Sequence, residues 1–156
     1  MQGGTERTLD LLGKCREGGM DVSAVWIQDW EGRRITSFGK RLQWDWRWDE
    51  KSYPGLDKVI AADENTRWMG YINPYLVESG VLFKAAQEKG YFVKKQDGSD
   101  YLFDFGEYDC GVVDLTMPEA FEWYKGVIKT NLIGLGFRGW MADLSLIHIS
   151  EPTRLG

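Results

Sequence analysis

The chain has 156 residues, of which 43% are hydrophobic and 28% are charged, and its formal net charge is −5. This composition is typical of a globular domain with a sizeable core, and it argues against intrinsic disorder. The negative charge argues against a protein that binds nucleic acid, because a phosphate backbone is held mainly by concentrated Lys and Arg. No apolar run approaches the ~20 residues that cross a bilayer, and the N-terminus lacks the charged-then-apolar order of a signal peptide. We therefore expect a soluble cytoplasmic protein with no membrane partner.

Cysteine and histidine are too few for most of the sites that these residues build. Cys15 and Cys110 lie far apart in the sequence, so we expect two reduced thiols and neither a disulfide scaffold nor a thiolate metal site. His148 is the single histidine, which leaves no imidazole cluster for zinc and no second candidate for a Ser-His-Asp site. The sequence therefore predicts that carboxylates carry any chemistry.

Segments with helical periodicity alternate along the chain with short apolar segments. Apolar residues at helical spacing predict helices over 6–16, from Pro54, after Ser79 to Lys89 and from Pro118 to about Leu132. Runs of β-branched and aromatic residues predict strands over Ser23–Ile27, Trp68–Asn73 and Phe137–Leu144. Possible arms of a hairpin are Tyr91–Val93 and Tyr101–Phe103. Side chains expected to cap the helices are Thr5, Ser79 and the capping-box pair Thr116 and Glu119.

This alternation predicts a parallel sheet with right-handed crossovers, in either a doubly wound sheet or part of a (β/α)8 barrel. Both architectures bind ligands at the C-terminal ends of their strands. The polar residues at these strand ends are Gln28, Asp29, Asn73 and Asp143. We therefore expect a ligand site at this edge of the sheet.

A basic and tryptophan-rich segment follows the first predicted strand. Its cations and indole rings are Arg33, Arg34, Lys40, Arg41, Trp44, Trp46 and Trp48. Fixed cations beside flat indole faces suit a ligand with an anionic end and a ring. The alternation of apolar and polar residues from Leu42 to Trp48 is equally typical of a half-buried edge strand that binds nothing. The residue pattern alone leaves both interpretations open.

Three motifs in this region resemble one enzyme family. They are Ile27-Gln28-Asp29-Trp30, Ser37-Phe38-Gly39-Lys40-Arg41 and Trp44-Asp45-Trp46. Together they are similar to the sulfoquinovosidases, the branch of glycoside hydrolase family 31 that cleaves α-glycosides of the sulfonated sugar sulfoquinovose. The resemblance covers nearly all of Gln2 to Asp143 and includes YINPY at 71–75 and GVVDLT at 111–116. It implies that residues 1–143 form the N-terminal half of a (β/α)8 TIM barrel, beginning after the first barrel strand. It also implies a small-molecule glycoside as substrate and no metal or organic cofactor.

The segment Gly139-Trp140-Met141-Ala142-Asp143 resembles the family segment that carries the catalytic nucleophile. A strand-end aspartate is in general more often a helix cap or an ion-pair partner, but the resemblance implies that Asp143 attacks the anomeric carbon. Such enzymes retain configuration by double displacement, with a second carboxylate about 5–5.5 Å away that acts first as acid and then as base. The second residue belongs to a later part of the family's barrel, and no residue of this chain matches it. We therefore expect the 156-residue chain to be inactive and only partly folded by itself.

The same matching assigns the substrate contacts. Gln28 would hydrogen-bond the sugar, Arg41 and Trp44 would hold the sulfonate, and Asp29 is a further predicted substrate-binding residue. A guanidinium with directed N–H groups and an indole donor suit a permanently charged sulfonate. Arg41 and Trp44 are three residues apart and would face opposite ways in a regular strand, so both reach one anion only if Lys40–Trp44 turns.

Two other functions remain open from the sequence: an α-glucosidase or related α-glycosidase with neutral substrates, and an aromatic-lined carbohydrate-binding module. Binding modules are usually β-sandwiches, which the alternation of helices and strands argues against. Residues 144–156, LSLIHISEPTRLG, depart from the family and resemble translated sequencing-adapter sequence, with a divergent C-terminal strand as the alternative. We therefore assign no function to His148, Glu151 or Arg154.

Overall fold

The structure is a computed structural model that describes residues 1–143. Its helices are α1 (Thr5–Glu17), α2 (Leu56–Ala62), α3 (Val81–Glu88), α4 (Pro118–Ile128) and the π-helical turn η1 (Lys129–Ile133), which continues α4. Its strands are β1 (Ala24–Trp26), β2 (Arg33–Thr36), β3 (Gly39–Leu42), β4 (Arg67–Ile72), β5 (Tyr75–Val77), β6 (Leu102–Asp104), β7 (Asp109–Val112) and β8 (Gly139–Ala142). The tail at 144–156 lies outside the described residues, so its interpretation stays a prediction. No helix within residues 1–143 is both long and apolar enough to cross a membrane.

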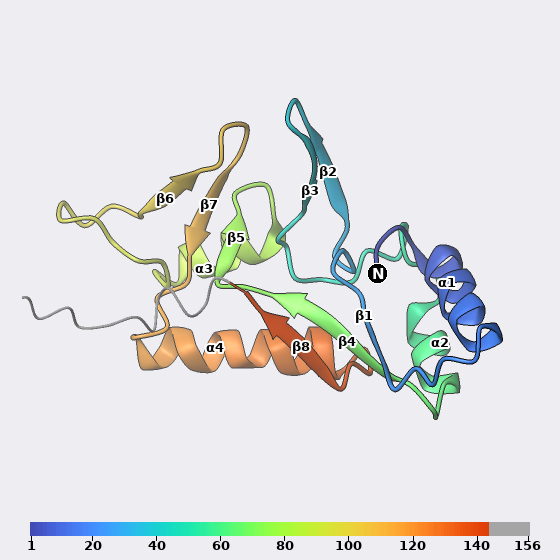
Figure 1. The fold of residues 1–156 in the computed structure, drawn as a ribbon. Coiled ribbons are helices and arrows are strands. Elements are labelled where there is room, and N and C mark those ends of the chain that lie inside the picture. Colours follow the sequence, from blue (N-terminus) through green and yellow to red (C-terminus); the bar gives the residue numbers. More distant parts are fainter. Residues whose placement is uncertain (144–156) are drawn as a thin grey trace, which may run out of the picture.

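Strands β1, β4 and β8 form a parallel sheet in that order (Figure 1). In the chain, α2 comes between β1 and β4, and α4 with η1 comes between β4 and β8. Parallel neighbours need such a crossover, because the chain must return to the same end of the sheet before the next strand. The predicted alternation and the predicted parallel sheet are therefore confirmed.

The core is built around buried aromatic rings. Trp30 and Phe137 meet edge to face with their ring centroids 5.6 Å apart. Gly70 in β4 makes room for this pair, because a Cβ atom there would lie 3.0 Å from two carbons of the Phe137 ring. Trp30 Nε1 donates a hydrogen bond to the Tyr71 carbonyl at 2.8 Å, so this buried indole N–H is satisfied. These contacts fix the segment after β1 against β4 and against the chain that enters β8.

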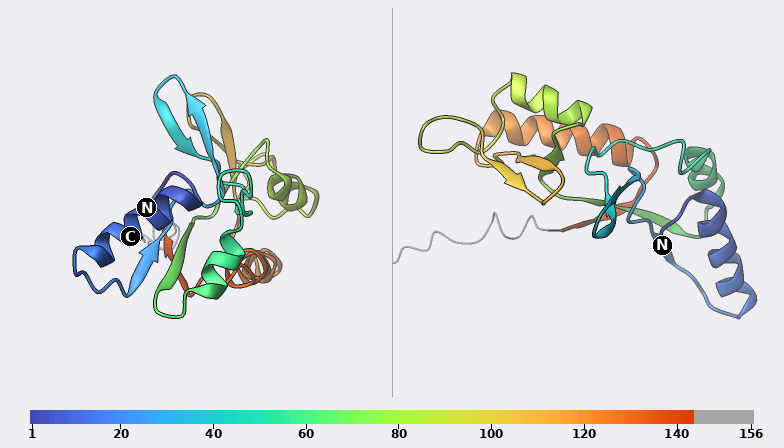
Figure 2. Two further views of the ribbon diagram at one scale, coloured as in Figure 1. Left: turned by 90° about the vertical axis from the view of Figure 1, so that its right-hand side faces the viewer. Right: turned by 90° about the horizontal axis from the view of Figure 1, so that it is seen from above.

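Two antiparallel units project above the parallel sheet, as Figure 1 and the left view of Figure 2 show. One is the hairpin β2–β3, in which Arg34 lies opposite Arg41 and Thr36 lies opposite Gly39. The other is a three-stranded sheet in which β7 lies between β5 and β6. The residue pattern predicted neither unit, although the first contains the basic part of the tryptophan-rich segment.

The predicted hairpin between residues 91–93 and 101–103 is formed in part. An antiparallel bridge joins Lys94 to Asp100, and the Tyr101 N–H donates a hydrogen bond to the Val93 carbonyl at 2.8 Å, whereas the rest of the second arm belongs to β6 and pairs with β7. The Phe92 ring is fully buried against Gly111 of β7, so tertiary burial outweighs the local turn pattern.

The side chains predicted as helix caps also do not cap the helices: Thr5, Ser79, and Thr116 with Glu119. The N-cap residues are Gly4 for α1, Gly80 for α3 and Met117 for α4, and none makes a side-chain capping bond. The Thr116 hydroxyl donates instead to Asp114 at 2.6 Å, in the turn before α4. An acceptor closer in the chain thus replaces the expected capping box.

The edge-strand interpretation of the tryptophan-rich segment is wrong as well. Strand β3 ends at Leu42, and Trp44 and Trp46 have positive φ values of 53° and 32°. Such values are uncommon outside glycine and turn the backbone away from a regular strand. The turn meets the condition under which Arg41 and Trp44 could serve one ligand.

Candidate active site

Polar residues from two neighbouring strands meet at the C-terminal edge of the parallel sheet, as predicted. Asn73 follows β4, and Asp143 follows β8, with Ile72 and Ala142 in register just before them. The Tyr71 hydroxyl donates a hydrogen bond to Asp143 Oδ2 at 2.8 Å, and Asn73 Nδ2 donates to the Tyr71 hydroxyl at 3.4 Å. Asp143 is exposed in residues 1–143, whereas Tyr71 and Asn73 are buried. The strand end thus carries an accessible carboxylate that a buried tyrosine orients.

Tyr71 keeps its proton in this position. Burial raises the pKa of its hydroxyl above the usual value of 10.0, and the hydrogen bond to Asp143 acts in the same direction. The neutral hydroxyl therefore remains a donor throughout the range in which a carboxylate nucleophile works. Sequence reasoning missed this role, although Tyr71 and Asn73 are two residues apart and so share one face of the strand.

A connected set of contacts runs from Asp143 to Trp44, the residue predicted to bind sulfonate. Asn73, which bonds to Tyr71, accepts at Oδ1 a hydrogen bond from the Tyr75 backbone N–H at 2.9 Å. The Tyr75 ring stacks on the Trp44 ring with centroids 5.5 Å apart. The structure therefore places both predicted residues on one packed framework of strand ends.

Aromatic rings hold the indole of Trp44 in place. Phe105 packs edge-on against it with ring centroids 5.0 Å apart, and Tyr108 does so at 6.3 Å. The Trp44 Nε1–H is buried and donates to no acceptor within residues 1–143. A buried donor without an acceptor is costly, so this N–H is a candidate ligand contact.

Arg41 lies on β3 and is exposed. Its guanidinium carbon is 4.9 Å from the centroid of the Phe38 ring, which supports the side chain from one face. Among residues 1–143 no carboxylate forms an ion pair with Arg41. Its charge is therefore open to an anionic ligand.

Asp29 is buried and is engaged by protein groups. It accepts hydrogen bonds from the Gly3 N–H at 3.1 Å and from the Tyr53 hydroxyl, and its Oδ2 lies 3.0 Å from Arg33 Nε in an ion pair. Burial raises the pKa of Tyr53 well above its usual value, so this hydroxyl remains a donor to the carboxylate. These bonds hold three separate segments together, and a substrate contact by Asp29 stays a prediction.

Gln28 lies at the end of β1 next to Asp29. Its Oε1 accepts a hydrogen bond from Gln2 Nε2 at 2.5 Å, and its backbone N–H donates to the Met1 carbonyl at 3.2 Å. The N-terminal segment thus runs along the predicted site. The predicted bond from Gln28 to a sugar is not tested by these contacts and stays a prediction.

Residues 3–154 match the profile of the glycosyl hydrolases family 31 TIM-barrel domain. The chain belongs to glycoside hydrolase family 31. The sulfoquinovosidase of Escherichia coli strain K12 is 48% identical over 145 residues, which are 92% of this chain and 21% of that protein. The sulfoquinovosidase of Agrobacterium fabrum strain C58 is 49% identical over 135 residues, 85% of this chain and 20% of that protein.

A solved structure of a family 31 sulfoquinovosidase from E. rectale, in complex with the aza-sugar inhibitor IFGSQ, has a TM-score of 0.84 and 55% identity to this family 31 chain. The match covers 91% of this chain and 22% of that one. The predicted fold class, a part of a (β/α)8 barrel, is therefore confirmed. The chain spans about a fifth of the length of the relatives that it matches.

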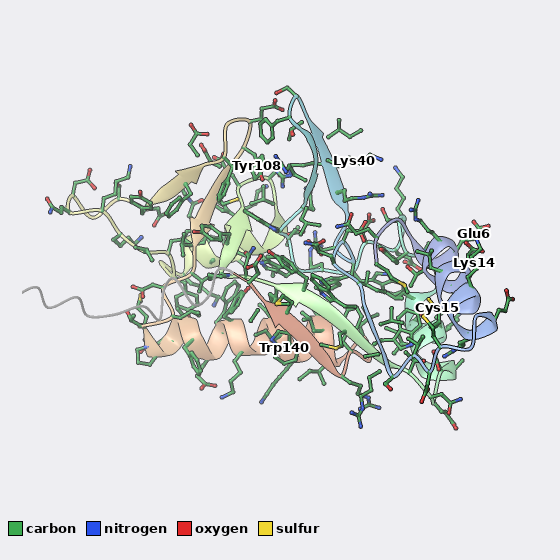
Figure 3. The ribbon with its side chains drawn as sticks, in the orientation of Figure 1. Glu6, Lys14, Cys15, Lys40, Tyr108 and Trp140 are labelled. Carbon is green, nitrogen blue, oxygen red and sulfur yellow. The ribbon has the colours of Figure 1, made fainter. Side chains whose placement is uncertain are left out.

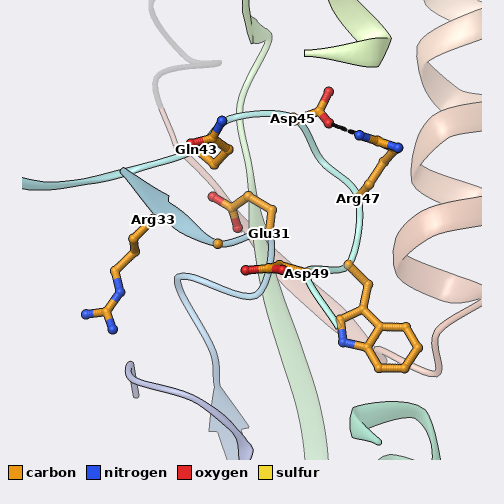
Figure 4. A pocket seen from close by; sticks show the side chains of 8 residues that line it. Glu31, Arg33, Gln43, Asp45, Arg47 and Asp49 are labelled. Atoms are coloured by element: carbon orange, nitrogen blue, oxygen red, sulfur yellow. Dashed lines mark hydrogen bonds and ion pairs between the residues drawn. The ribbon is translucent and has the colours of Figure 1, made fainter. Parts of the chain in front are cut away.

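A polar pocket of about 340 Å³ in this family 31 chain lies at the base of the hairpin β2–β3 (Figure 4). The labelled residues that line it are Glu31, Arg33, Gln43, Asp45, Arg47 and Asp49. Burial raises the pKa of the Glu31 carboxyl well above its usual value, and both of its oxygens are buried. None of the five predicted site residues lines this pocket, but the pocket borders the strand-end site, because Arg33 in its lining forms the ion pair with Asp29. The described part of the chain contains no acidic, Cys or His group suited to a metal ion.

Proposed function

We propose that this chain is a segment of a retaining α-glycosidase that hydrolyses α-glycosides of sulfoquinovose. The observation that carries the proposal is the set of contacts that joins Asp143 at the end of β8 to Trp44, which follows the exposed Arg41 by three residues. A nucleophile and an anion-binding pair on one framework suit a sugar with a negative group on the side away from the scissile bond. The identity of the chain to two sulfoquinovosidases supports the same substrate class.

Asp143 is the nucleophile in this proposal. Its carboxylate attacks the anomeric carbon while the leaving oxygen takes a proton from a second carboxylic acid, which gives a glycosyl ester. The second carboxylate then removes a proton from water, whose oxygen attacks the same carbon and releases Asp143. Two inversions at one carbon retain the α configuration. Tyr71 holds the Asp143 carboxylate by its 2.8 Å bond, so the attacking group is oriented before the sugar arrives.

Arg41 and Trp44 supply the contacts to the sulfonate. Arg41 offers an always-charged guanidinium, and Trp44 offers an indole N–H that has no acceptor among residues 1–143. Gln28 and Asp29 lie at the neighbouring strand end, where Gln28 would bond to a sugar hydroxyl. Asp29 would act with its partners Tyr53 and Arg33 to shape that side of the site.

The test compares two substrates that share one leaving group. It uses a full-length family 31 enzyme that contains residues 1–143 of this chain, hereafter the carrier enzyme. We expect kcat/KM for 4-nitrophenyl α-sulfoquinovoside to exceed that for 4-nitrophenyl α-glucoside by at least ~100-fold, because an anion-binding site rejects a sugar that leaves its charges unpaired. Equal values, or a preference for glucoside, would favour an α-glycosidase with neutral substrates. Binding without hydrolysis of either compound would favour a carbohydrate-binding protein.

A further inference from the structure

The tip of the hairpin β2–β3 is bonded to the turn between β6 and β7. The Ser37 backbone N–H donates a hydrogen bond to Glu107 Oε1 at 2.8 Å, although the two residues are 70 positions apart in the chain. Bonds from Ser37 hold the pKa of the Glu107 carboxyl below its usual value, so the acceptor stays ionised at neutral pH. A two-stranded hairpin alone is marginally stable in water, so an anchor at its tip limits how far it can move.

A second contact lies nearer the base of the same hairpin. The guanidinium carbon of Arg34 is 4.0 Å from the centroid of the Tyr108 ring. Figure 3 shows Tyr108 between the hairpin β2–β3 and the strands β6 and β7. Arg34 Nη2 also donates to the Gln43 carbonyl at 2.6 Å. The Tyr108 ring contacts Trp44 as well, with centroids 6.3 Å apart. One tyrosine thus touches both the hairpin and a predicted sulfonate-binding residue.

These contacts act on Arg41 through its neighbours. Arg34 and Arg41 are directly opposite each other in the hairpin, and like charges in such a pair repel. Tyr108 and the Gln43 carbonyl draw the Arg34 guanidinium to one side, while Arg41 rests on the Phe38 ring. Phe38 follows Ser37, so the bond from Ser37 to Glu107 also holds the backbone next to the ring that supports Arg41.

The turn between β6 and β7 is shaped to approach Phe38. Gly106 has φ of 94°, which favours glycine, and a Cβ atom there would lie 3.4 Å from the Phe38 ring. The Asp104 carboxylate accepts a bond from the Gly106 N–H at 2.6 Å, which closes the turn that presents Glu107. The turn is therefore ordered by its own bonds before it holds the hairpin.

We propose that Glu107 and Tyr108 are positioning residues that hold the hairpin β2–β3 so that Arg41 and Trp44 meet one anionic group of the substrate. We call the pair of contacts Glu107–Ser37 and Tyr108–Arg34 the hairpin clamp. The inference rests on the proposed function and deepens it. It assigns the selection of sulfonated over neutral sugars to the hairpin β2–β3 together with the turn between β6 and β7, and not to the hairpin alone.

The test measures KM and kcat of carrier-enzyme variants on the two 4-nitrophenyl glycosides. Glu107→Ala removes the acceptor, Glu107→Gln keeps an acceptor oxygen, and Tyr108→Leu removes the ring beneath Arg34. Asp97→Ala is the matched control, because Asp97 is another exposed turn carboxylate and accepts its bonds from Ser99 in the same turn. Hydrogen exchange at the amides of 33–42 follows the hairpin without any substrate, and a thermal melt checks folding.

We expect Glu107→Ala and Tyr108→Leu to raise KM for the sulfoquinovoside by roughly 3- to 10-fold. This is the change in affinity that corresponds to the free energy of about one hydrogen bond. The kcat for the sulfoquinovoside, and kcat and KM for the glucoside, should stay within about 2-fold of the parent values. Glu107→Gln and Asp97→Ala should match the parent on both substrates. Hydrogen exchange at the amides of residues 33–42 should be faster than in the parent in Glu107→Ala. It should be unchanged in the control Asp97→Ala.

Three results would overturn the hairpin clamp: unchanged KM and exchange in Glu107→Ala, equal losses on both substrates, or failure of that variant to fold. The last two would show that Glu107 supports the fold and not selectivity. A parent enzyme without sulfoquinovoside hydrolysis would instead refute the proposed function, and hydrogen exchange would still report whether the clamp holds the hairpin.

Discussion

At the scale of single residues, the contact that matters most is the hydrogen bond from Tyr71 to Asp143. It crosses from β4 to β8 and links the carboxylate to Asn73, so the proposed nucleophile is oriented by groups that are themselves buried. The position of Asp143 at a strand end could be predicted from sequence, since apolar strand patterns show where each strand stops. The donor that orients it could not, because its identity depends on which strand lies beside β8.

We expect Tyr71→Phe to lower kcat of the carrier enzyme by roughly 10- to 100-fold, the effect of losing a charge-assisted hydrogen bond of about 1.5–3 kcal/mol. In the parent enzyme the raised pKa of Tyr71 keeps its hydroxyl neutral, so ionisation of Tyr71 should cause no loss of kcat up to pH 10.0. Steady-state rates across the pH range measure both effects. An unchanged kcat in Tyr71→Phe would show that this bond does not orient the nucleophile.

Arg41 should decide between charged and neutral sugars. Arg41→Ala should lower kcat/KM for the sulfoquinovoside by ~10- to 100-fold and leave the glucoside nearly unchanged, because only the sulfonate loses a charge-assisted partner. Lys40→Ala is the control, since Lys40 is the adjacent cation of the same strand and points to the other face of the hairpin. Similar losses on both substrates, or a similar effect of Lys40→Ala, would contradict the assignment.

At the scale of elements, local pattern and tertiary packing decided different parts of the fold. The helices and the parallel strands followed from periodicity, because one buried face sets the spacing of apolar residues in each. The antiparallel pair β6–β7 could not be predicted from periodicity. It depends on tertiary packing, in which the Phe92 ring occupies the space beside Gly111 of β7. Likewise, no local signal shows that Glu107 would bond to a residue 70 positions away.

The close approach of Phe92 to β7 can be tested with two glycines. A Cβ atom at Gly111 would lie 2.6 Å from the Phe92 ring, so Gly111→Ala should destabilise the carrier enzyme by about 1–3 kcal/mol. Gly126 in α4 has no atom within 4 Å of such a Cβ, and Gly126→Ala should stabilise by about 0.5–1 kcal/mol through helix propensity. Thermal melting of both variants compares them, and equal midpoints would contradict this packing.

At the scale of the whole molecule, the parallel sheet of residues 1–143 has three strands and is not closed. The order β1-β4-β8 leaves β1 and β8 each with one neighbour in the described chain, whereas a barrel removes its edges by closing. The relatives are about five times as long as the segment that matches them. The site is therefore proposed as one side of a larger cavity.

We expect the 156-residue chain, expressed alone, to release no nitrophenol from the sulfoquinovoside and to melt without one sharp transition. The open sheet edges leave apolar surface uncovered, and the loss of general acid help alone typically costs ~10²–10⁴-fold in rate. The substrate assay and circular dichroism measure the two properties. A soluble monomer with a sharp melt and measurable turnover would show that these residues suffice.

The most direct test of the central claim is to trap the covalent intermediate. The carrier enzyme is treated with a fluorinated sulfoquinovosyl fluoride, which slows hydrolysis of the glycosyl ester, and its peptides are analysed by mass spectrometry. We predict one adduct, on the peptide that contains Asp143, and none in Asp143→Asn, because an amide cannot form the ester. An adduct on any other carboxylate, or an Asp143→Asn enzyme that keeps its turnover, would contradict the assignment of Asp143 as the nucleophile.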